Sequence, residues 1–229
     1  TKIVQFWTAT VRSKSGPGPI DPTEIDTTSW VGLDEAEALL TRQSDVVALT
    51  ALRRFLDSEE LVTVPIIIQR HGAALSRSKW RKGEKSRPLN SKGKKQAKAL
   101  PDLIDAFDPG RVLSSPWKRC RATVEPFTRL EGLKIATKDE LSEAGHHDHP
   151  SRTAAVIERV LREARGTVVC THRPVLPTVI SSVREAATRG TAFELPRQDP
   201  YLAAGEALML HTTPAGSVVA LERHLPNLG

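Results

Sequence analysis

Three adjacent residues, Arg70, His71 and Gly72, are the strongest candidates for chemistry in this chain of 229 residues. A guanidinium group offers a planar fork of donors that matches the oxygens of a phosphate. A neutral imidazole is a good nucleophile, so His71 could attack a phosphorus atom that Arg70 holds. Gly72 is expected to let the backbone approach the bound anion closely. The alternative is an ordinary strand end with a solvated arginine and a capping histidine.

The residues before these three predict the element that positions them. Residues 65–69 read Pro-Ile-Ile-Ile-Gln, a run that is mostly apolar and β-branched and too short for a helix, which is typical of a buried strand. Two more apolar runs, residues 111–113 and 167–170, also end in polar segments. Ligands of open α/β sheets bind at the carboxyl ends of the strands, so these three strand ends are expected to form one site.

The segments after the second and third strands also carry groups that bind anions. Residues 114–123 read Ser-Ser-Pro-Trp-Lys-Arg-Cys-Arg-Ala-Thr and include Arg119, and residues 171–174 read Thr-His-Arg-Pro. Together with Arg70, the side chains of Arg119, His172 and Arg173 could stabilise the charge on phosphoryl oxygens. Fixed cations would replace a metal ion here, so no metal and no cofactor are expected at this site.

These blocks, in this order, resemble the histidine phosphatase (phosphoglycerate-mutase-like) superfamily. The shared pattern is a strand with Arg-His-Gly, then Ser-Ser-Pro-x-x-Arg-x-x-x-Thr, then a strand with a second histidine. Residues 86–97 also look like the family's Arg-Pro-Leu segment and the helix that follows it, and the resemblance covers roughly residues 62–224. It implies that His71 carries a phosphohistidine intermediate, and that Arg70, Arg119 and His172 clamp the phosphate.

A carboxylic acid is the family's usual proton donor to the leaving oxygen. Glu143 fits the family pattern Leu-x-Glu…Gly better than Glu140, which is the alternative; both could instead be solvated carboxylates. The residue after the second histidine is glycine in the family but Arg173 here, which favours a longer polyanion such as a diphosphate. Residues 146–149, His-His-Asp-His, have some metal-ligand character, but an exposed loop is expected.

The positive charge of the chain is concentrated close to the expected nucleophile. The net charge is +6, and Glu84 is the single acid between Arg70 and Lys98, among many lysines and arginines. A positive field of this kind recruits anionic substrates. The candidate substrate loop contains the following residues: Ser76, Arg77, Lys79 and Arg81. Aromatic residues make up 4% of the chain, which leaves few platforms for base stacking and argues against a nucleic-acid partner.

Cysteine content and hydropathy indicate the compartment. The two cysteines, Cys120 and Cys170, are expected to be small buried side chains in a reducing cytoplasm, not a disulfide. No apolar stretch approaches the length of a membrane span, and the start does not resemble a signal peptide. We therefore expect a cytoplasmic protein without a membrane partner.

From residue 65 onward, strands and helices alternate, which predicts an α/β fold with a three-layer, mostly parallel sheet and helices on both faces. The expected helices span residues 92–106, 117–130, 152–164 and 176–188. A strand is expected at residues 133–137, and two late strands, 206–212 and 217–223, are joined by a Thr-Pro-Ala-Gly turn. Residues 63–229 are predicted to form the phosphatase domain.

Residues 1–62 resemble the carboxyl half of a Nudix hydrolase domain, a partial α+β segment. Residues 2–11 alternate like a strand, residues 29–36 are consistent with a strand and an Asp-capped helix, and a helix is expected at 45–56. The glutamate-rich Nudix box that binds magnesium is missing, so magnesium is expected only with a complete Nudix domain. Because the chain starts at Thr1, we expect a fragment whose missing Nudix half is a separate or cleaved chain.

This pairing resembles the actinobacterial MutT-type two-domain hydrolases, which act on oxidised-guanine nucleotides and dinucleoside polyphosphates. It implies hydrolysis of nucleoside di- and triphosphates in nucleotide-pool sanitation and DNA repair, with dinucleoside polyphosphates left to the intact Nudix domain. One alternative is a phosphohistidine protein phosphatase in signalling, the activity of compact superfamily members. A second is a basic nucleic-acid-binding module on an inactive phosphatase fold, against which the intact His71 and His172 argue.

Overall fold

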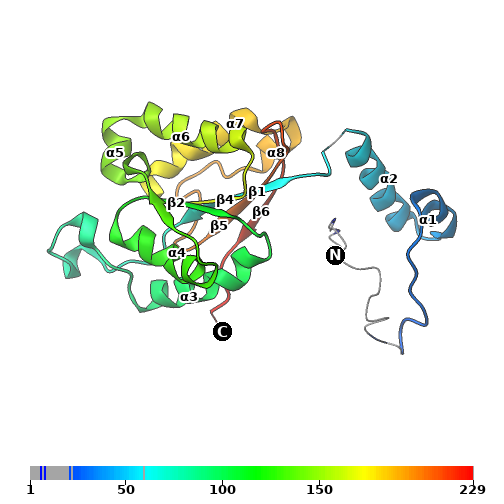
Figure 1. Ribbon diagram of the computed structural model, residues 1–229, viewed down its shortest axis with the longest axis horizontal. Coiled ribbons are helices and arrows are strands. Elements are labelled where there is room, and N and C mark those ends of the chain that lie inside the picture. The colour runs from blue at the N-terminus through cyan, green and yellow to red at the C-terminus, as the bar shows by residue number, and fades with distance from the viewer. Residues whose placement is uncertain (1–5, 7, 9–20, 22, 59, 229) are drawn as a thin grey trace. The chain divides into compact units, whose positions relative to one another are not determined.

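The computed structural model describes residues 6, 8, 21, 23–58 and 60–228, and the chain divides into two compact units, Thr1–Leu61 and Val62–Gly229 (Figure 1). The described part of the first unit contains helices α1 (Leu33–Leu39) and α2 (Gln43–Asp57). Helix α2 confirms the helix expected at residues 45–56. Apart from Phe6 and Thr8, the strand predicted at residues 2–11 lies outside the described residues.

Two sequence predictions for residues 29–36 are wrong. Residues 29–32 form no strand, and the described part of this unit contains no strand with which they could pair. The N-cap of α1 is Gly32, without a side-chain cap, and Asp34 lies inside the first turn instead. There its carboxylate is stabilised by the positive end of the helix dipole, and it accepts a hydrogen bond from Arg53 of α2 at 2.7 Å.

The second unit is built on one six-stranded sheet with the order β3-β2-β4-β1-β5-β6 (Figure 1). Its strands are β1 (Val64–Arg70), β2 (Arg111–Ser114), β3 (Ile135–Thr137), β4 (Thr167–Thr171), β5 (Ala207–Thr212) and β6 (Val218–His224). Strands β1 to β4 are parallel to one another, β5 is antiparallel to β1, and β6 is antiparallel to β5. The short Thr-Pro-Ala-Gly segment joins β5 to β6, because a tight turn can connect only antiparallel neighbours. The predicted α/β fold with a mostly parallel sheet is confirmed.

Helices cover both faces of this sheet (Figure 1). One face carries α3 (Ser91–Asp105) and α4 (Lys118–Leu130), and the other carries α5 (Glu143–Asp148), α6 (Pro150–Glu163), α7 (Leu176–Ala186) and α8 (Arg189–Glu194). Strand side chains alternate between faces, so Ile66 and Ile68 pack in the cluster with α6 and α7, and Ile67 packs with α3 and α4. Burial on both faces explains why β1 is a continuous apolar run.

The four longer predicted helices are confirmed with small shifts at their ends, whereas the short helices α5 and α8 were not predicted. Helix α5 replaces the loop expected at residues 146–149. It starts where Ser142 accepts a hydrogen bond from the amide of Gly145 at 3.0 Å, which is a side-chain N-cap. Four 3₁₀ turns complete the unit: η1 (Arg77–Lys79), η2 (Glu84–Ser86), η3 (Asp139–Leu141) and η4 (Arg173–Val175).

The sheet register brings three strand ends together. Arg70 at the end of β1 pairs with Thr171 at the end of β4, and Ser114 at the end of β2 pairs with Cys170. The segments that follow β1, β2 and β4 therefore leave the same edge of the sheet side by side. Both cysteines are buried free thiols, as expected. Among the described residues, no helix has the length and apolar character needed to cross a membrane.

Candidate active site

His71 follows β1 and is held in one tautomer by its surroundings. Its backbone N–H donates to the carbonyl of Thr171 at 3.0 Å, and its ring is 7% exposed. The Nδ1 atom lies 2.8 Å from the carbonyl oxygen of Gly72 and must carry the hydrogen of that bond. Burial lowers the pKa of His71 to about 3, and the charges of Arg119 and Arg70 add to this effect. The ring is therefore neutral, with the lone pair on Nε2.

Gly72 has a packing role in the loop after β1. Its N–H donates to Oγ1 of Thr123 at 2.9 Å, and a Cβ added here would lie 3.0 Å from the carbonyl oxygen of Gly93. Gly93 fits still more tightly, since its added Cβ would lie 2.0 Å from the carbonyl oxygen of Ala73. These glycines let the loop after β1 pack on the start of α3. The structure thus gives Gly72 a packing reason to be glycine, and its amide already donates to Thr123.

Arg119, in the first turn of α4, is fully buried and contacts three groups of the site. Its Nε lies 3.2 Å from Nε2 of His71, Nη1 donates to the carbonyl of Glu84 at 2.8 Å, and Nη2 lies 2.5 Å from Oε1 of Glu143. The guanidinium also stacks over the Trp117 ring, 4.6 Å from its centroid. Burial lowers the pKa of Arg119, and the Glu143 carboxylate counteracts that effect.

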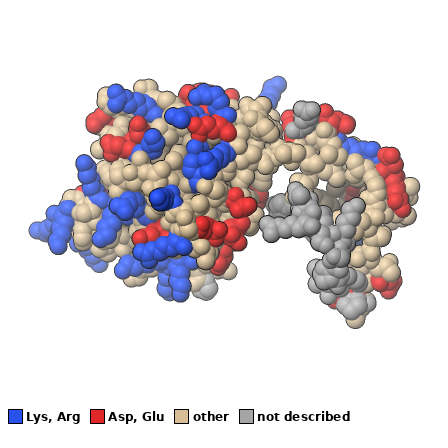
Figure 2. Space-filling model, viewed as in Figure 1, with Lys and Arg blue, Asp and Glu red and all other residues tan. Residues whose placement is uncertain are grey.

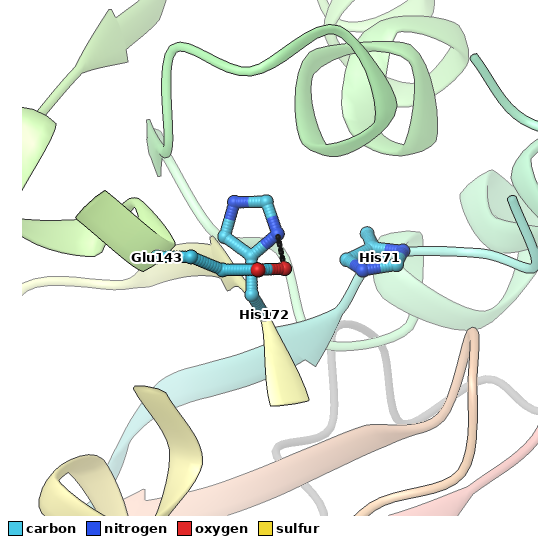
Figure 3. Close-up of side chains that lie close together, drawn as sticks. All are labelled: His71, Glu143 and His172. Carbon is cyan, nitrogen blue, oxygen red and sulfur yellow. Dashed lines mark ion pairs between the residues drawn. The ribbon is translucent and has the colours of Figure 1, made fainter. Parts of the chain in front are cut away.

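His172 and Glu143 complete the cluster around His71. His172 follows β4 and is buried; its Nε2 lies 2.8 Å from Oγ of Ser115, and its Nδ1 lies 3.4 Å from Oε1 of Glu143 (Figure 3). The His71 and His172 rings are 5.1 Å apart between centroids. Of the two carboxylates considered, Glu143 is the one that reaches this cluster, whereas Glu140 lies in η3 with its carbonyl bonded to Thr153.

The same three residues have donor atoms with metal-ligand spacing. One ligand atom each from His71, Glu143 and His172 lies within 4.8 Å of the others. However, the Arg119 guanidinium contacts both His71 and Glu143 directly, and its positive charge would oppose a cation at that point. Two imidazoles beside a buried guanidinium suit a tetrahedral anion better than a metal ion.

Arg70 and Arg173 both bond to the segment that precedes β5, but to different partners. Nη1 of Arg70 donates to the carbonyl of Leu202 at 2.5 Å, while its buried Nε has no hydrogen-bond partner among the described residues. Burial lowers the pKa of Arg70, and the charge of Arg173 adds to this effect. Arg173 itself is exposed and forms an ion pair with Asp199, its Nε donating to Oδ1 at 2.8 Å. Arg70 thus retains a free donor, and Arg173 is held by a carboxylate.

The family model for the histidine phosphatase superfamily (branch 1) matches residues 66–193, more than half of the chain. The chain belongs to this superfamily. It is also 30% identical over 182 residues to a curated 8-oxo-(d)GTP phosphatase of Mycolicibacterium smegmatis. That match covers 79% of this chain and 54% of the relative, so the chain spans about half the length of the relative.

Two solved structures show the same fold at low sequence identity. SixA, a protein histidine phosphatase in complex with tungstate, has a TM-score of 0.53 and 20% identity, covering 71% of this chain and 97% of SixA. A SixA protein from Nakamurella multipartitia has a TM-score of 0.54 and 22% identity, covering 72% and 97% respectively. Superfamily membership and the phosphatase relative make this protein a hydrolase.

Within this histidine phosphatase domain, one of the four candidate loop residues reaches the cluster. Arg77 donates from Nε to Oε1 of Glu84 at 3.1 Å, and its Nη2 lies 3.5 Å from Oε2 of Glu143. Ser76 bonds to the hydroxyl of Ser78 instead, and Lys79 and Arg81 are exposed. Lysines and arginines gather over this loop and along α3 on the face shown in Figure 2.

Sequence reasoning missed two residues of the histidine phosphatase site, Arg87 and Glu84. Arg87 donates from Nη1 to the carbonyl of Leu75 at 2.7 Å and from Nε to Oε2 of Glu84 at 3.1 Å. Its charge is among the causes that lower the pKa values of His71 and His172, after the larger effect of burial. The available signal was Glu84 itself, a single acid in a strongly basic segment that must attract the cations around it.

Proposed function

We propose that this protein hydrolyses phosphoanhydride bonds of nucleoside di- and triphosphates through a phosphohistidine at His71, with oxidised-guanine (8-oxo) nucleotides as preferred substrates. The observation that carries the chemistry is the neutral His71 ring, whose Nε2 lies 3.2 Å from the Arg119 guanidinium. The nucleotide substrate is supported by the 8-oxo-(d)GTP phosphatase relative and by the basic loop after β1. In cells, this activity would remove damaged nucleotides from the nucleotide pool.

In the first step, the N–H of Arg119 Nε, which donates to Nε2 of His71, turns to the bound phosphate. The freed lone pair on Nε2 attacks the terminal phosphorus, and the bond from phosphorus to the bridging oxygen breaks. The shortened nucleotide leaves with that electron pair. Arg70, Arg119 and His172 hold the non-bridging oxygens, and the unpaired Nε of Arg70 gains an acceptor. A phosphate leaving group is already stable as an anion, so this substrate class depends little on an acid.

In the second step, water attacks the phosphorus of the phosphohistidine. The nitrogen–phosphorus bond breaks, its electron pair returns to Nε2 of His71, and the water proton passes to the Glu143 carboxylate. Glu143 lies 2.5 Å from Arg119 and 3.4 Å from Nδ1 of His172, so it can reach the site of attack. For a poorer leaving group, the same carboxyl group would donate its proton in the first step.

The remaining proposals concern the cofactor, the location and the first unit. The phosphatase reaction needs no metal in this scheme, because arginines and histidines supply the charge stabilisation. We further propose a cytoplasmic protein, and a Nudix-like identity for residues 1–62. Magnesium-dependent hydrolysis of dinucleoside polyphosphates would require the other half of that Nudix domain as a partner.

One assay tests the function against its alternatives. The protein is incubated in EDTA with 8-oxo-dGDP, GDP, a sugar monophosphate and a phosphohistidine protein, and the released phosphate is measured. We expect release from the two diphosphates, faster from 8-oxo-dGDP, and none from the His71→Ala variant. Phosphate release from the phosphohistidine protein and from none of the other substrates would instead indicate a phosphohistidine phosphatase in signalling. No turnover, together with salt-sensitive oligonucleotide binding, would indicate a nucleic-acid-binding module.

A further inference from the structure

Three arginines surround the carboxylate of Glu84 in the loop after β1. Oε1 of Glu84 accepts from Nε of Arg77 at 3.1 Å, Oε2 accepts from Nε of Arg87 at 3.1 Å, and Nη2 of Arg119 lies 3.6 Å from Oε2. Burial raises the pKa of Glu84, but the hydrogen bonds and charges of Arg87, Arg77 and Arg119 outweigh it and lower the pKa below its usual value. Glu84 is thus an ionised group in a site built from cations.

This carboxylate lies close to the reacting nitrogen. Arg119 connects the two, since its Nε is 3.2 Å from Nε2 of His71 and its Nη2 faces Glu84. Arg77 connects Glu84 to the other carboxylate of the site, with Nη2 lying 3.5 Å from Oε2 of Glu143. Anions bound at the Glu84 position and on His71 would therefore both contact the Arg119 guanidinium.

The groups around the Glu84 carboxylate differ in exposure and in how they are anchored. Gly83, directly before Glu84, has a φ of +81°, which glycine adopts without strain, and the Glu84 side chain is 35% exposed. Arg87 is 11% exposed and anchored on the carbonyl of Leu75 at 2.7 Å, whereas Arg77 is 70% exposed. Arg87 is therefore the anchored, nearly buried donor, and Arg77 is the solvent-exposed one.

We propose that the Glu84 carboxylate occupies the place of the substrate's second phosphate in the free enzyme, and that Arg77 and Arg87 form the subsite that binds this phosphate. The inference rests on the proposed function and specifies its substrate class as compounds with two adjacent phosphates. Guanidinium groups bind carboxylate and phosphate with the same fork geometry, so the phosphate can replace Glu84 on the same donors. The phosphate carries more negative charge than the carboxylate and therefore wins the exchange.

Binding of inorganic pyrophosphate and orthophosphate tests the subsite without turnover. Titration calorimetry in EDTA compares the wild type with Arg77→Gln, Glu84→Gln and Lys95→Gln. Lys95 is exposed on α3, outside the site, so its variant matches the charge change of Arg77→Gln. We expect Arg77→Gln to weaken pyrophosphate binding about tenfold, the scale of one charged hydrogen bond, and to leave orthophosphate binding unchanged. Glu84→Gln is expected to strengthen pyrophosphate binding, and Lys95→Gln to change neither.

Three results would overturn the subsite. One is an equal loss of pyrophosphate and orthophosphate binding in Arg77→Gln, or no loss at all. The second is a loss in Lys95→Gln as large as that in Arg77→Gln, which would indicate a general field effect. The third is weaker pyrophosphate binding in Glu84→Gln, which would make Glu84 an organiser of the arginines and not a competitor. Circular dichroism melts verify that each variant is folded.

Steady-state assays separate this inference from the proposed function. If the wild type releases no phosphate from nucleoside diphosphates but shows the expected pyrophosphate binding, the subsite is supported and the nucleotide function is refuted. If the wild type hydrolyses nucleoside diphosphates but the variants do not show the expected changes in pyrophosphate binding, the function is supported and the subsite is refuted. An Arg87→Lys variant adds a second readout, since lysine keeps the charge but lacks the planar fork of donors. We expect it to weaken the binding of pyrophosphate more than the binding of orthophosphate.

Discussion

Nε of Arg119 lies 3.2 Å from Nε2 of His71, and both side chains are buried. The guanidinium disfavours protonation of the imidazole, because a second positive charge at that distance would be repelled. It also supplies a donor where the oxygens of a phosphoryl group on Nε2 would lie. One contact between segments 48 residues apart therefore keeps the nucleophile neutral and prepares the site for an anion.

The first prediction concerns Arg119. Arg119→Lys keeps the positive charge but loses the planar fork that contacts His71, Glu84 and Glu143 together, so we expect kcat to fall about 100-fold or more. Arg121→Lys, on the exposed side of the same helix, is the matched control and should retain wild-type activity. Steady-state kinetics with a nucleoside diphosphate measures both. Equal activity of the two variants would refute the role given to Arg119.

The second prediction concerns acid stability. Above pH 6.5, His71 is neutral in both the folded and unfolded protein, so its contribution to stability is fully present. As the pH falls from 6.5 towards 3, His71 becomes protonated in the unfolded chain but stays neutral in the folded chain. The free energy of unfolding therefore falls by at most about 5 kcal/mol. His71→Asn removes this titration, so its free energy of unfolding should fall less steeply with acid. Urea titrations between pH 4 and 7 that give parallel curves would contradict the buried neutral ring.

The third prediction concerns the packing of the loop after β1. A Cβ on Gly93 would lie 2.0 Å from the carbonyl oxygen of Ala73, so Gly93→Ala must displace the backbone beside His71. We expect a loss of about 2 kcal/mol or more in the free energy of unfolding, together with lower activity. Gly110→Ala is the control, because its Cβ would meet nothing within 4 Å. If urea unfolding shows equal stability for both variants, the tight packing of this loop on α3 is wrong.

The sequence predicted the parallel core and the residues at its carboxyl edge because each signal was local. Arg70, Arg119 and His172 each lie at or just after a buried apolar run, and parallel strands necessarily bring such ends together. The preference for Glu143 over Glu140 came from the resemblance to the family pattern Leu-x-Glu…Gly. The strand expected at residues 29–32 failed for the opposite reason, since a strand depends on a partner that local sequence does not contain.

Contacts between distant segments could not be predicted from one sequence. Glu84 and Arg119 are 35 residues apart, and Asp199 is 26 residues from Arg173. Arg173 departs from the family pattern and was expected to favour a longer polyanion. In the structure its charge is paired with Asp199 instead. The packing of Gly72 on Gly93 was equally hidden, because a glycine near an anion and a glycine under a helix look the same in sequence.

The fourth prediction concerns the two units. Both core clusters and every residue proposed for the reaction lie within residues 62–229. We therefore expect this segment, expressed alone, to fold cooperatively and to hydrolyse nucleoside diphosphates with the kcat of the 229-residue chain. Thermal melts and phosphate release measure the two properties. A truncated protein that is folded but inactive would show that residues 1–61 contribute to the site.

Trapping the phosphoenzyme tests the central claim most directly. The protein is mixed in EDTA with a nucleoside diphosphate labelled in its terminal phosphate, quenched within the first turnover, and digested for peptide mapping. We predict a phosphate label on His71 that survives alkali, is lost in acid, and is missing from His71→Ala. Phosphate release with no label on His71, or a label on another residue, would contradict the mechanism.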